Sequence, residues 1–143
     1  MKWYLGLLTC FLFVSFGSHA QNTPIKICVV HKGELKEIDA IYTATGDTTV
    51  VVDGKTKFFR EVYGKGEYAG GKKWYINNES VVIGSVKYVK YGLPRILLAI
   101  EVTKAGVYKE VPYFKEAGFS GIPEVIYVPV VPGCEFQPYM KEL

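Results

Sequence analysis

Short runs of β-forming residues, separated by turn residues, constrain the fold of this chain more than any other feature. Val, Ile, Tyr, Phe and Thr dominate these runs. Turn residues recur about every 8 to 12 positions, which is typical of an all-β sandwich or barrel. The clearest single signal is Asp53-Gly54, since Asp-Gly between two β-rich runs favours a two-residue hairpin turn. The sequence predicts an all-β fold: a single, mostly antiparallel β-barrel or β-sandwich of about seven to nine strands.

The expected strands are 25–30, 48–52, 55–59, 74–76, 81–83, 86–91, 95–102, 107–111 and 125–131. The run 35–43 fits neither a helical nor a strand period. Along 95–102, apolar residues alternate on both faces, which predicts a strand covered on both sides. Pro129 removes a backbone donor from 125–131, so this strand is expected at an edge or a bulge.

Two segments depart from the strand pattern. Pro112 to Gly118 is the best candidate for one short helix, because it has proline at its start and glycine at its end. The glycine-rich stretch 63–73 is predicted to be a mobile loop. No composition shift divides residues 21–143, which are therefore expected to form one domain.

The first twenty residues have the layout of a secretory signal peptide. Lys2 gives a short positive start, Leu5 to Phe16 is almost entirely apolar, and Ser18 and Ala20 are small residues suited to a cleavage site. A spanning helix needs about 20 apolar residues, so no transmembrane span is expected after the signal is removed. An uncleaved N-terminal anchor is the alternative. The signal predicts an exported chain, periplasmic or secreted.

Cleavage after Ala20 would remove Cys10 and leave Cys28 and Cys134. An even pair in an exported domain predicts one disulfide bond. It would close a loop of roughly 106 residues, for which the chain-entropy model gives about 4–5 kcal/mol. Two free buried thiols are the alternative.

The charge balance argues against nucleic acid as a partner. The chain has 17 basic and 14 acidic residues, a formal net charge of +3, with both signs interspersed. Nucleic-acid binders usually carry a basic face or a clustered basic run. The stretch 66–73 resembles a phosphate-binding loop, but Lys73 replaces the Ser or Thr that would hold magnesium. No cofactor is expected.

Catalytic and metal-binding residue types are scarce, so no catalytic residue and no metal ligand is assigned. His31 is the one histidine after residue 20, and a disulfide would leave no thiolate nucleophile. Dispersed surface carboxylates are the default interpretation of the glutamates. The enzyme alternative is a glycan- or peptidoglycan-acting hydrolase, in which two of them would meet. The candidates are Glu61, Glu67, Glu79, Glu101 and Glu124.

Aromatic residues gather around the glycine-rich stretch. Tyrosine and tryptophan combine a large apolar face with a polar group, which suits protein interfaces and sugar platforms. The candidate residues for binding a ligand or partner are Tyr68, Trp74, Tyr75, Tyr88 and Tyr91. The alternative is that some of them are core residues and the others ordinary strand tyrosines.

These observations predict a non-enzymatic binding or accessory protein of a bacterial cell envelope. Its partner would be an envelope protein or a glycan that contacts the aromatic residues. A structural subunit that assembles by strand addition at the 125–131 edge is a further alternative.

Overall fold

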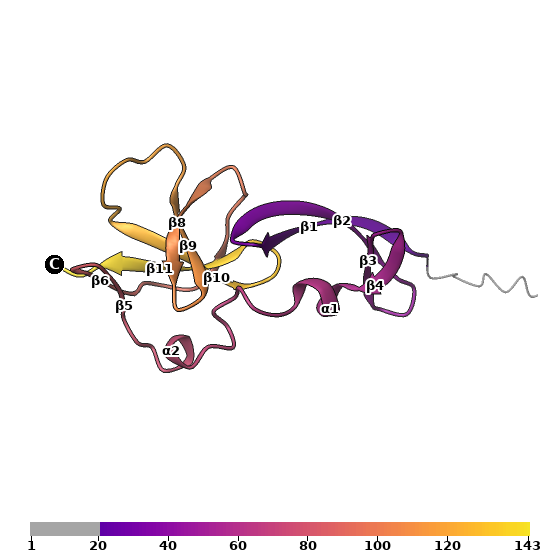
Figure 1. Ribbon diagram of the computed structural model, residues 1–143, viewed down its shortest axis with the longest axis horizontal. Coiled ribbons are helices and arrows are strands. Elements are labelled where there is room, and N and C mark those ends of the chain that lie inside the picture. Colours follow the sequence, from indigo (N-terminus) through magenta and orange to yellow (C-terminus); the bar gives the residue numbers. More distant parts are fainter. Residues whose placement is uncertain (1–20) are drawn as a thin grey trace, which may run out of the picture.

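The computed structural model describes residues 21–143, so the predicted signal peptide lies outside the described residues. These residues form eleven strands and two short helices, and every strand pairing among them is antiparallel. The expectation of an all-β, mostly antiparallel fold is confirmed. The strands form two sheets, which lie next to each other along the long axis of the molecule (Figure 1).

The N-terminal part of the described residues forms a four-stranded sheet in the order β1-β2-β3-β4. Its strands are β1 (Thr23–His31), β2 (Glu34–Tyr42), β3 (Thr48–Val52) and β4 (Lys55–Phe58). Asp53 and Gly54 connect β3 and β4 with φ angles of 52° and 72°, which confirms the predicted hairpin turn. Helix α1 (Phe59–Tyr63) follows and contacts β1, β3 and β4.

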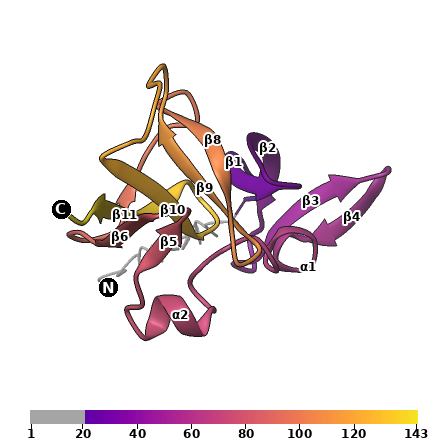
Figure 2. The same ribbon diagram turned by 60° about the vertical axis from the view of Figure 1, so that its left-hand side comes forward.

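A seven-stranded sheet contains the rest, in the order β5-β6-β11-β10-β9-β8, with β7 pairing to β11. Its strands are β5 (Val81–Ile83), β6 (Val86–Lys90), β7 (Arg95–Ile96), β8 (Val102–Tyr108), β9 (Val111–Glu116), β10 (Val125–Val131) and β11 (Glu135–Lys141). Helix α2 (Lys73–Ile76) precedes it and lies beside β5 (Figure 2). The sheet is curled, so that its strands enclose much of their own core.

Side chains alternate between the two faces of the seven-stranded sheet, and each face carries a buried cluster. On one face, Trp74 of α2 packs with Tyr88, Ile126 and Tyr139. On the other face, Phe114 and Phe136 lie 5.7 Å apart in an edge-to-face arrangement. Cys28 and Leu35 of the β1–β2 hairpin pack against this second cluster, so the hairpin tip covers part of the larger sheet.

The disulfide between Cys28 and Cys134 is present and joins the two sheets. Cys28 lies in β1, and Cys134 lies in the turn between β10 and β11, with a Cα–Cα distance of 5.3 Å. Gly133 N donates to Cys28 O over 2.8 Å beside the bridge. The predicted covalent link therefore connects the first strand to the last hairpin.

Strand β10 has the bounds predicted from the sequence, and the ladder shifts register between Pro129 and Val131, as expected of a bulge. Of the two expected positions for this strand, edge or bulge, the bulge is therefore the one found. β10 lies between β9 and β11, and Ala69 N and Gly70 N donate to the carbonyls of Pro129 and Val130. Strand addition at 125–131 therefore has no free edge to use.

The expected helix at 112–118 is wrong, because Val111–Glu116 forms β9. Val111 and Phe114 are buried on opposite faces of this strand, and Tyr127 of β10 pairs with Phe114. Burial on both faces outweighs the proline and glycine signals. Conversely, Trp74 to Ile76 is helical rather than extended, because one turn of helix directs the buried Trp74 side chain into the core.

In the run 95–102, only Arg95 and Ile96, which form β7, and Val102, which begins β8, are in strands. Leu97 packs into the core, whereas Ile96, Leu98 and Ile100 are exposed, so the predicted coverage on both sides is wrong. Glu101 closes a turn here, as its Oε2 accepts a hydrogen bond from Leu98 N over 2.6 Å. The ambiguous run 35–43 lies largely in β2.

The glycine-rich stretch 63–73 is held at several points rather than being a free loop. Tyr68 Oη accepts a hydrogen bond from Val30 N over 2.9 Å, and Ala69 and Gly70 bond to β10. A β-carbon on Gly70 would come within 2.7 Å of Val130 O, so only glycine permits this close approach.

Candidate functional site

The five aromatic residues predicted to bind a partner do not form one exposed surface. Trp74 is 6% exposed and Tyr88 2% exposed, and both belong to the core on the α2 side of the larger sheet. Tyr75 packs against the same core and is half-buried. Tyr91, at 56% exposed, is open to solvent.

The partly buried tyrosines of this set have partners within the fold. Burial raises the pKa of Tyr68, whose hydroxyl accepts the Val30 amide. Lys90 Nζ lies 3.7 Å from the centroid of the Tyr75 ring and donates to Tyr75 O, and burial lowers the pKa of this lysine. These contacts give Tyr68 and Tyr75 roles in the fold, whether or not they also bind a partner.

An open apolar groove lies instead in the four-stranded sheet, a place that the sequence did not indicate. Its volume is about 630 Å³, within the range of about 300–1,000 Å³ usual for ligand pockets. We call it the β2–β3 groove. Its lining residues are Pro24, Ile25, Glu37, Ile38, Asp39, Ala40, Ile41, Thr49, Val50, Val51, Thr56 and Tyr63.

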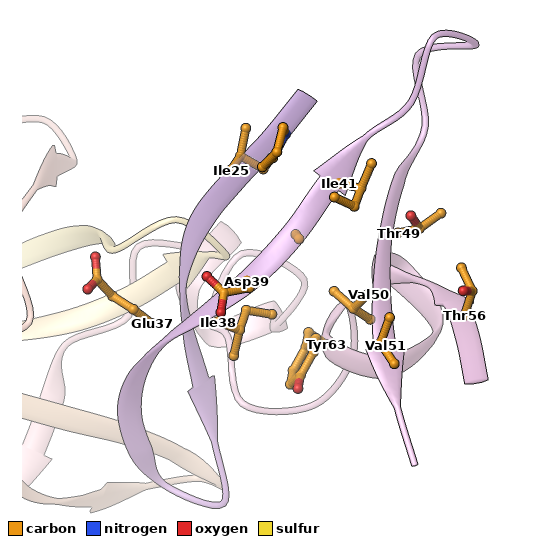
Figure 3. A pocket seen from close by; sticks show the side chains of 12 residues that line it. Ile25, Glu37, Ile38, Asp39, Ile41, Thr49, Val50, Val51, Thr56 and Tyr63 are labelled. Atoms are coloured by element: carbon orange, nitrogen blue, oxygen red, sulfur yellow. The ribbon is translucent and has the colours of Figure 1, made fainter. Parts of the chain in front are cut away.

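The groove arises because β2 and β3 separate. They pair only at Ile41–Thr49 and Tyr42–Thr48, and beyond these pairs the two strands diverge. Figure 2 shows the β3–β4 hairpin pointing away from the β1–β2 hairpin. Ile38, Val50, Val51 and Tyr63 lie between the two arms (Figure 3).

Buried and exposed apolar side chains both contribute to the groove. Ala40 and Val50 are buried at its base, whereas Val51 is 68% exposed at its rim. Tyr63 of α1 is held by aromatic contacts to Phe59 and His31, with ring centroids 5.5 Å and 5.6 Å away. The groove thus combines buried side chains at its base with solvent-accessible apolar side chains along its wall.

The charged residues of the groove are carboxylates on β2. Asp39 accepts a hydrogen bond from Lys26 Nζ over 2.9 Å, and this contact raises the pKa of the lysine. Within residues 21–143, the carboxylate of Glu37 has no ion-pair partner. Glu37 and Asp39 point away from the apolar group in Figure 3, as alternation along a strand requires.

Three of the five glutamates considered for catalysis bind separate partners, and Glu61 is exposed in α1. Glu67 accepts from Gly33 N, Glu79 pairs with Lys109 and Glu124 pairs with Lys141. Glu101 differs, because it lines a pocket of about 600 Å³ together with Glu116, Arg95 and Tyr127. In that pocket Arg95 Nη2 donates to Tyr127 Oη over 2.7 Å.

In the part of the chain that the structure describes, no three His, Cys, Asp or Glu side chains lie close enough together to hold a metal ion. None of the helices within residues 21–143 has the length and apolar character needed to cross a membrane. No protein-family model, curated protein sequence or solved structure matches this chain.

Proposed function

We propose that this chain is an exported, non-enzymatic binding protein of a bacterial cell envelope, and that the β2–β3 groove is its binding site. The open, apolar groove of about 630 Å³ is the observation that carries the proposal. Exposed apolar surface at a concave site is typical of places where proteins bind ligands or partners. The disulfide between the sheets is compatible with export.

The site belongs to the part of the fold that contributes least to the core. Neither principal core cluster includes a residue of β2 or β3 among its fully buried members. A partner that contacts these strands would therefore leave the packing of the larger sheet unchanged.

A retention experiment with two matched variants tests the proposal. Protein produced from the full-length sequence is immobilised in its oxidised form and exposed to a detergent-treated envelope extract. Val51→Asp places a charge at the groove, and Val82→Asp makes the same change at an exposed valine of β5. We expect a retained protein or glycan to be lost with Val51→Asp and kept with Val82→Asp. Equal retention by all three proteins would refute a binding role for the groove.

A glycan hydrolase is the second candidate, favoured by the pocket that Glu101 and Glu116 share. Two carboxyl groups in one pocket are what general acid–base hydrolysis of a glycosidic bond requires. This candidate would be supported if the protein releases reducing ends from peptidoglycan and if Glu101→Gln and Glu116→Gln, each as a single variant, abolish the release. Absence of release by the unsubstituted protein would reject it.

A further inference from the structure

We propose that the β2–β3 groove binds an extended peptide segment of a partner protein, which adds as a strand to β2 and carries basic and apolar side chains in alternation. This inference rests on the proposed binding function and names the partner class. It follows from the direction of the backbone groups along the groove and from the residues on either face of β2.

The turn between β1 and β2 fixes which backbone groups of β2 are free. Lys32 and Gly33 have φ angles of 53° and 76°, so they form a two-residue turn of the primed type. The flanking residues His31 and Glu34 then bond to each other, and bonded pairs alternate along the hairpin. On this count Lys36, Ile38 and Ala40 bond to β1, whereas the N–H and C=O groups of Glu37 and Asp39 point away from it.

Three contacts of β1 agree with this assignment. Pro24 has no N–H and lies opposite Ile41, at a position where no cross-strand bond is made. Cys28 O accepts from Gly133 N, and Val30 N donates to Tyr68 Oη, so these groups also point away from β2.

The second hairpin gives the same result for the opposite arm of the groove. Its two-residue turn makes Val52–Lys55 and Val50–Lys57 the bonded pairs, so the backbone of Val51 points toward β2. Beyond the pairs at Ile41 and Tyr42, β3 does not reach β2. Among residues 21–143, no cross-strand pair joins Glu37 or Asp39 to β3, or Val51 to β2, so we infer that their N–H and C=O groups facing the groove are unpaired. Two unpaired strand edges therefore face the same groove.

Unpaired edges that face a groove are the feature by which proteins bind extended peptides. Main-chain bonds to Glu37 and Asp39 would hold such a peptide, and the apolar wall would receive every second side chain. A lipid or a small apolar ligand could contact the apolar wall of the groove but would leave the backbone groups of both strand edges without hydrogen-bond partners.

The two faces of β2 define the side chains of the peptide. Cross-strand neighbours share a face, so residues opposite Ile38 and Ala40 would be apolar and would contact Val50 and Tyr63. Residues opposite Glu37 and Asp39 would lie beside carboxylates. The carboxylate of Glu37 is free of ion pairs in the described part of the chain, and Asp39 has a single exposed lysine partner. Basic side chains are therefore favoured there, and acidic ones are repelled.

Fluorescence anisotropy with three labelled peptides tests the proposal on the oxidised, full-length protein. The first peptide is Lys-Val-Lys-Val-Lys-Val-Lys, the second replaces each lysine by glutamate, and the third carries N-methyl groups on alternate amides. We expect the first to bind. The affinity of the second peptide should be at least about tenfold lower. The affinity of the third should also be about tenfold lower, because its methylated amides cannot donate hydrogen bonds to the β2 edge.

Matched protein variants locate the site. Glu37→Lys/Asp39→Lys should lower the affinity for the first peptide and raise the affinity for the glutamate peptide. Glu110→Lys/Glu142→Lys makes the same charge change at exposed positions beside the larger sheet and should alter neither affinity. Equal binding of the lysine and N-methylated peptides would overturn the strand-addition mode. A protein that binds no peptide but dimerises, with Glu37→Lys/Asp39→Lys dissociating the dimer, would show that a second copy is the occupant and overturn the proposal.

The experiment separates this inference from the function on which it rests. If no peptide binds, yet Val51→Asp still abolishes retention of an envelope component and Val82→Asp does not, the groove binds a partner of another class. The proposed function then stands and the peptide inference falls.

Discussion

The two sheets differ in what their side chains do. In the seven-stranded sheet, both faces are covered by packed clusters that include Phe114, Phe136 and Tyr139. In the four-stranded sheet, Val29, Val30, Ala40 and Val50 are buried, while Val51 is largely exposed. The larger sheet therefore supplies most of the buried core, whereas the smaller sheet leaves an open apolar groove.

A small number of contacts joins the two regions. The disulfide links β1 to the β10–β11 turn, Val30 N donates to Tyr68 Oη, and Gly33 N donates to Glu67. All of them lie at the end of the β1–β2 hairpin nearest the larger sheet. The groove lies farther along the same hairpin, so its opening does not depend on core packing in the larger sheet.

The largest expected effect comes from a cavity in the seven-stranded sheet. Phe136 is fully buried and packs edge-to-face on Phe114. Phe136→Ala should lower the free energy of unfolding by about 3–5 kcal/mol. Val50→Ala, in the other sheet, should cost only about 2 kcal/mol, since it removes two methyl groups. Urea unfolding of both variants measures this, and a loss below about 2 kcal/mol for Phe136→Ala would contradict its place in the core of the seven-stranded sheet.

Removal of the disulfide should have the next largest effect. It closes a loop with a sequence separation of 106 residues. Cys28→Ala/Cys134→Ala should reduce the free energy of unfolding by about 2–4 kcal/mol. Hydrogen exchange should then rise more in β1 and β2 than in β10 and β11, because the bridge attaches the smaller sheet to the larger core. A uniform rise across both sheets would contradict this role for the bridge.

A smaller effect of opposite sign is expected at Tyr139. Within residues 21–143 its buried hydroxyl has no hydrogen-bond partner. Tyr139→Phe should therefore raise the free energy of unfolding by about 1 kcal/mol. Tyr127→Phe is the matched control, since it removes the hydroxyl bonded to Arg95 and should be destabilising. Thermal unfolding measures the effect. A lower Tm for Tyr139→Phe than for the unsubstituted protein would show that the Tyr139 hydroxyl does have a hydrogen-bond partner.

The same tyrosine gives a pH dependence with a defined sign. Burial, followed by the nearby Tyr75 and Tyr108, raises the pKa of Tyr139 above its value in the unfolded chain, which is about 10. Below that pH both states are protonated and stability is unaffected. Above it the unfolded state ionises first, so the free energy of unfolding falls as pH rises toward the folded-state pKa. Tyr139→Phe should show a shallower alkaline decline in chemical denaturation.

Local signals in the sequence predicted the elements whose geometry is decided locally. Asp53-Gly54 forms the expected turn, Val125–Val131 is a strand with the expected bulge, and Cys28 pairs with Cys134. Pro112–Gly118 and Trp74–Ile76 were misassigned because tertiary burial outweighs local propensity at Phe114 and Trp74. The choice between an edge and a bulge for β10 could not be made from the sequence, because sheet order depends on pairing between distant segments.

The candidate site could not be predicted from residue types. Aromatic clustering indicated Trp74 and Tyr88, which the fold buries. The groove depends instead on where β2 and β3 stop pairing, and that position is set by two turns and by the contacts of α1. The two residues proposed to bind the peptide, Glu37 and Asp39, lie in the run 35–43, which fits neither a helical nor a strand period. A primed two-residue turn at Lys32-Gly33 was the one sequence signal that could have shown which backbone groups of β2 point away from β1.

Amide hydrogen exchange along β2, resolved residue by residue by NMR in the free, oxidised protein, tests whether β2 has an open edge. We expect alternation: the amides of Ile38 and Ala40 are protected by their bonds to β1, and those of Glu37 and Asp39 exchange fast. Val51 should exchange as fast as they do. Uniform protection from Glu37 to Ala40 would show that the edge is already paired, and would contradict an open strand edge in the β2–β3 groove.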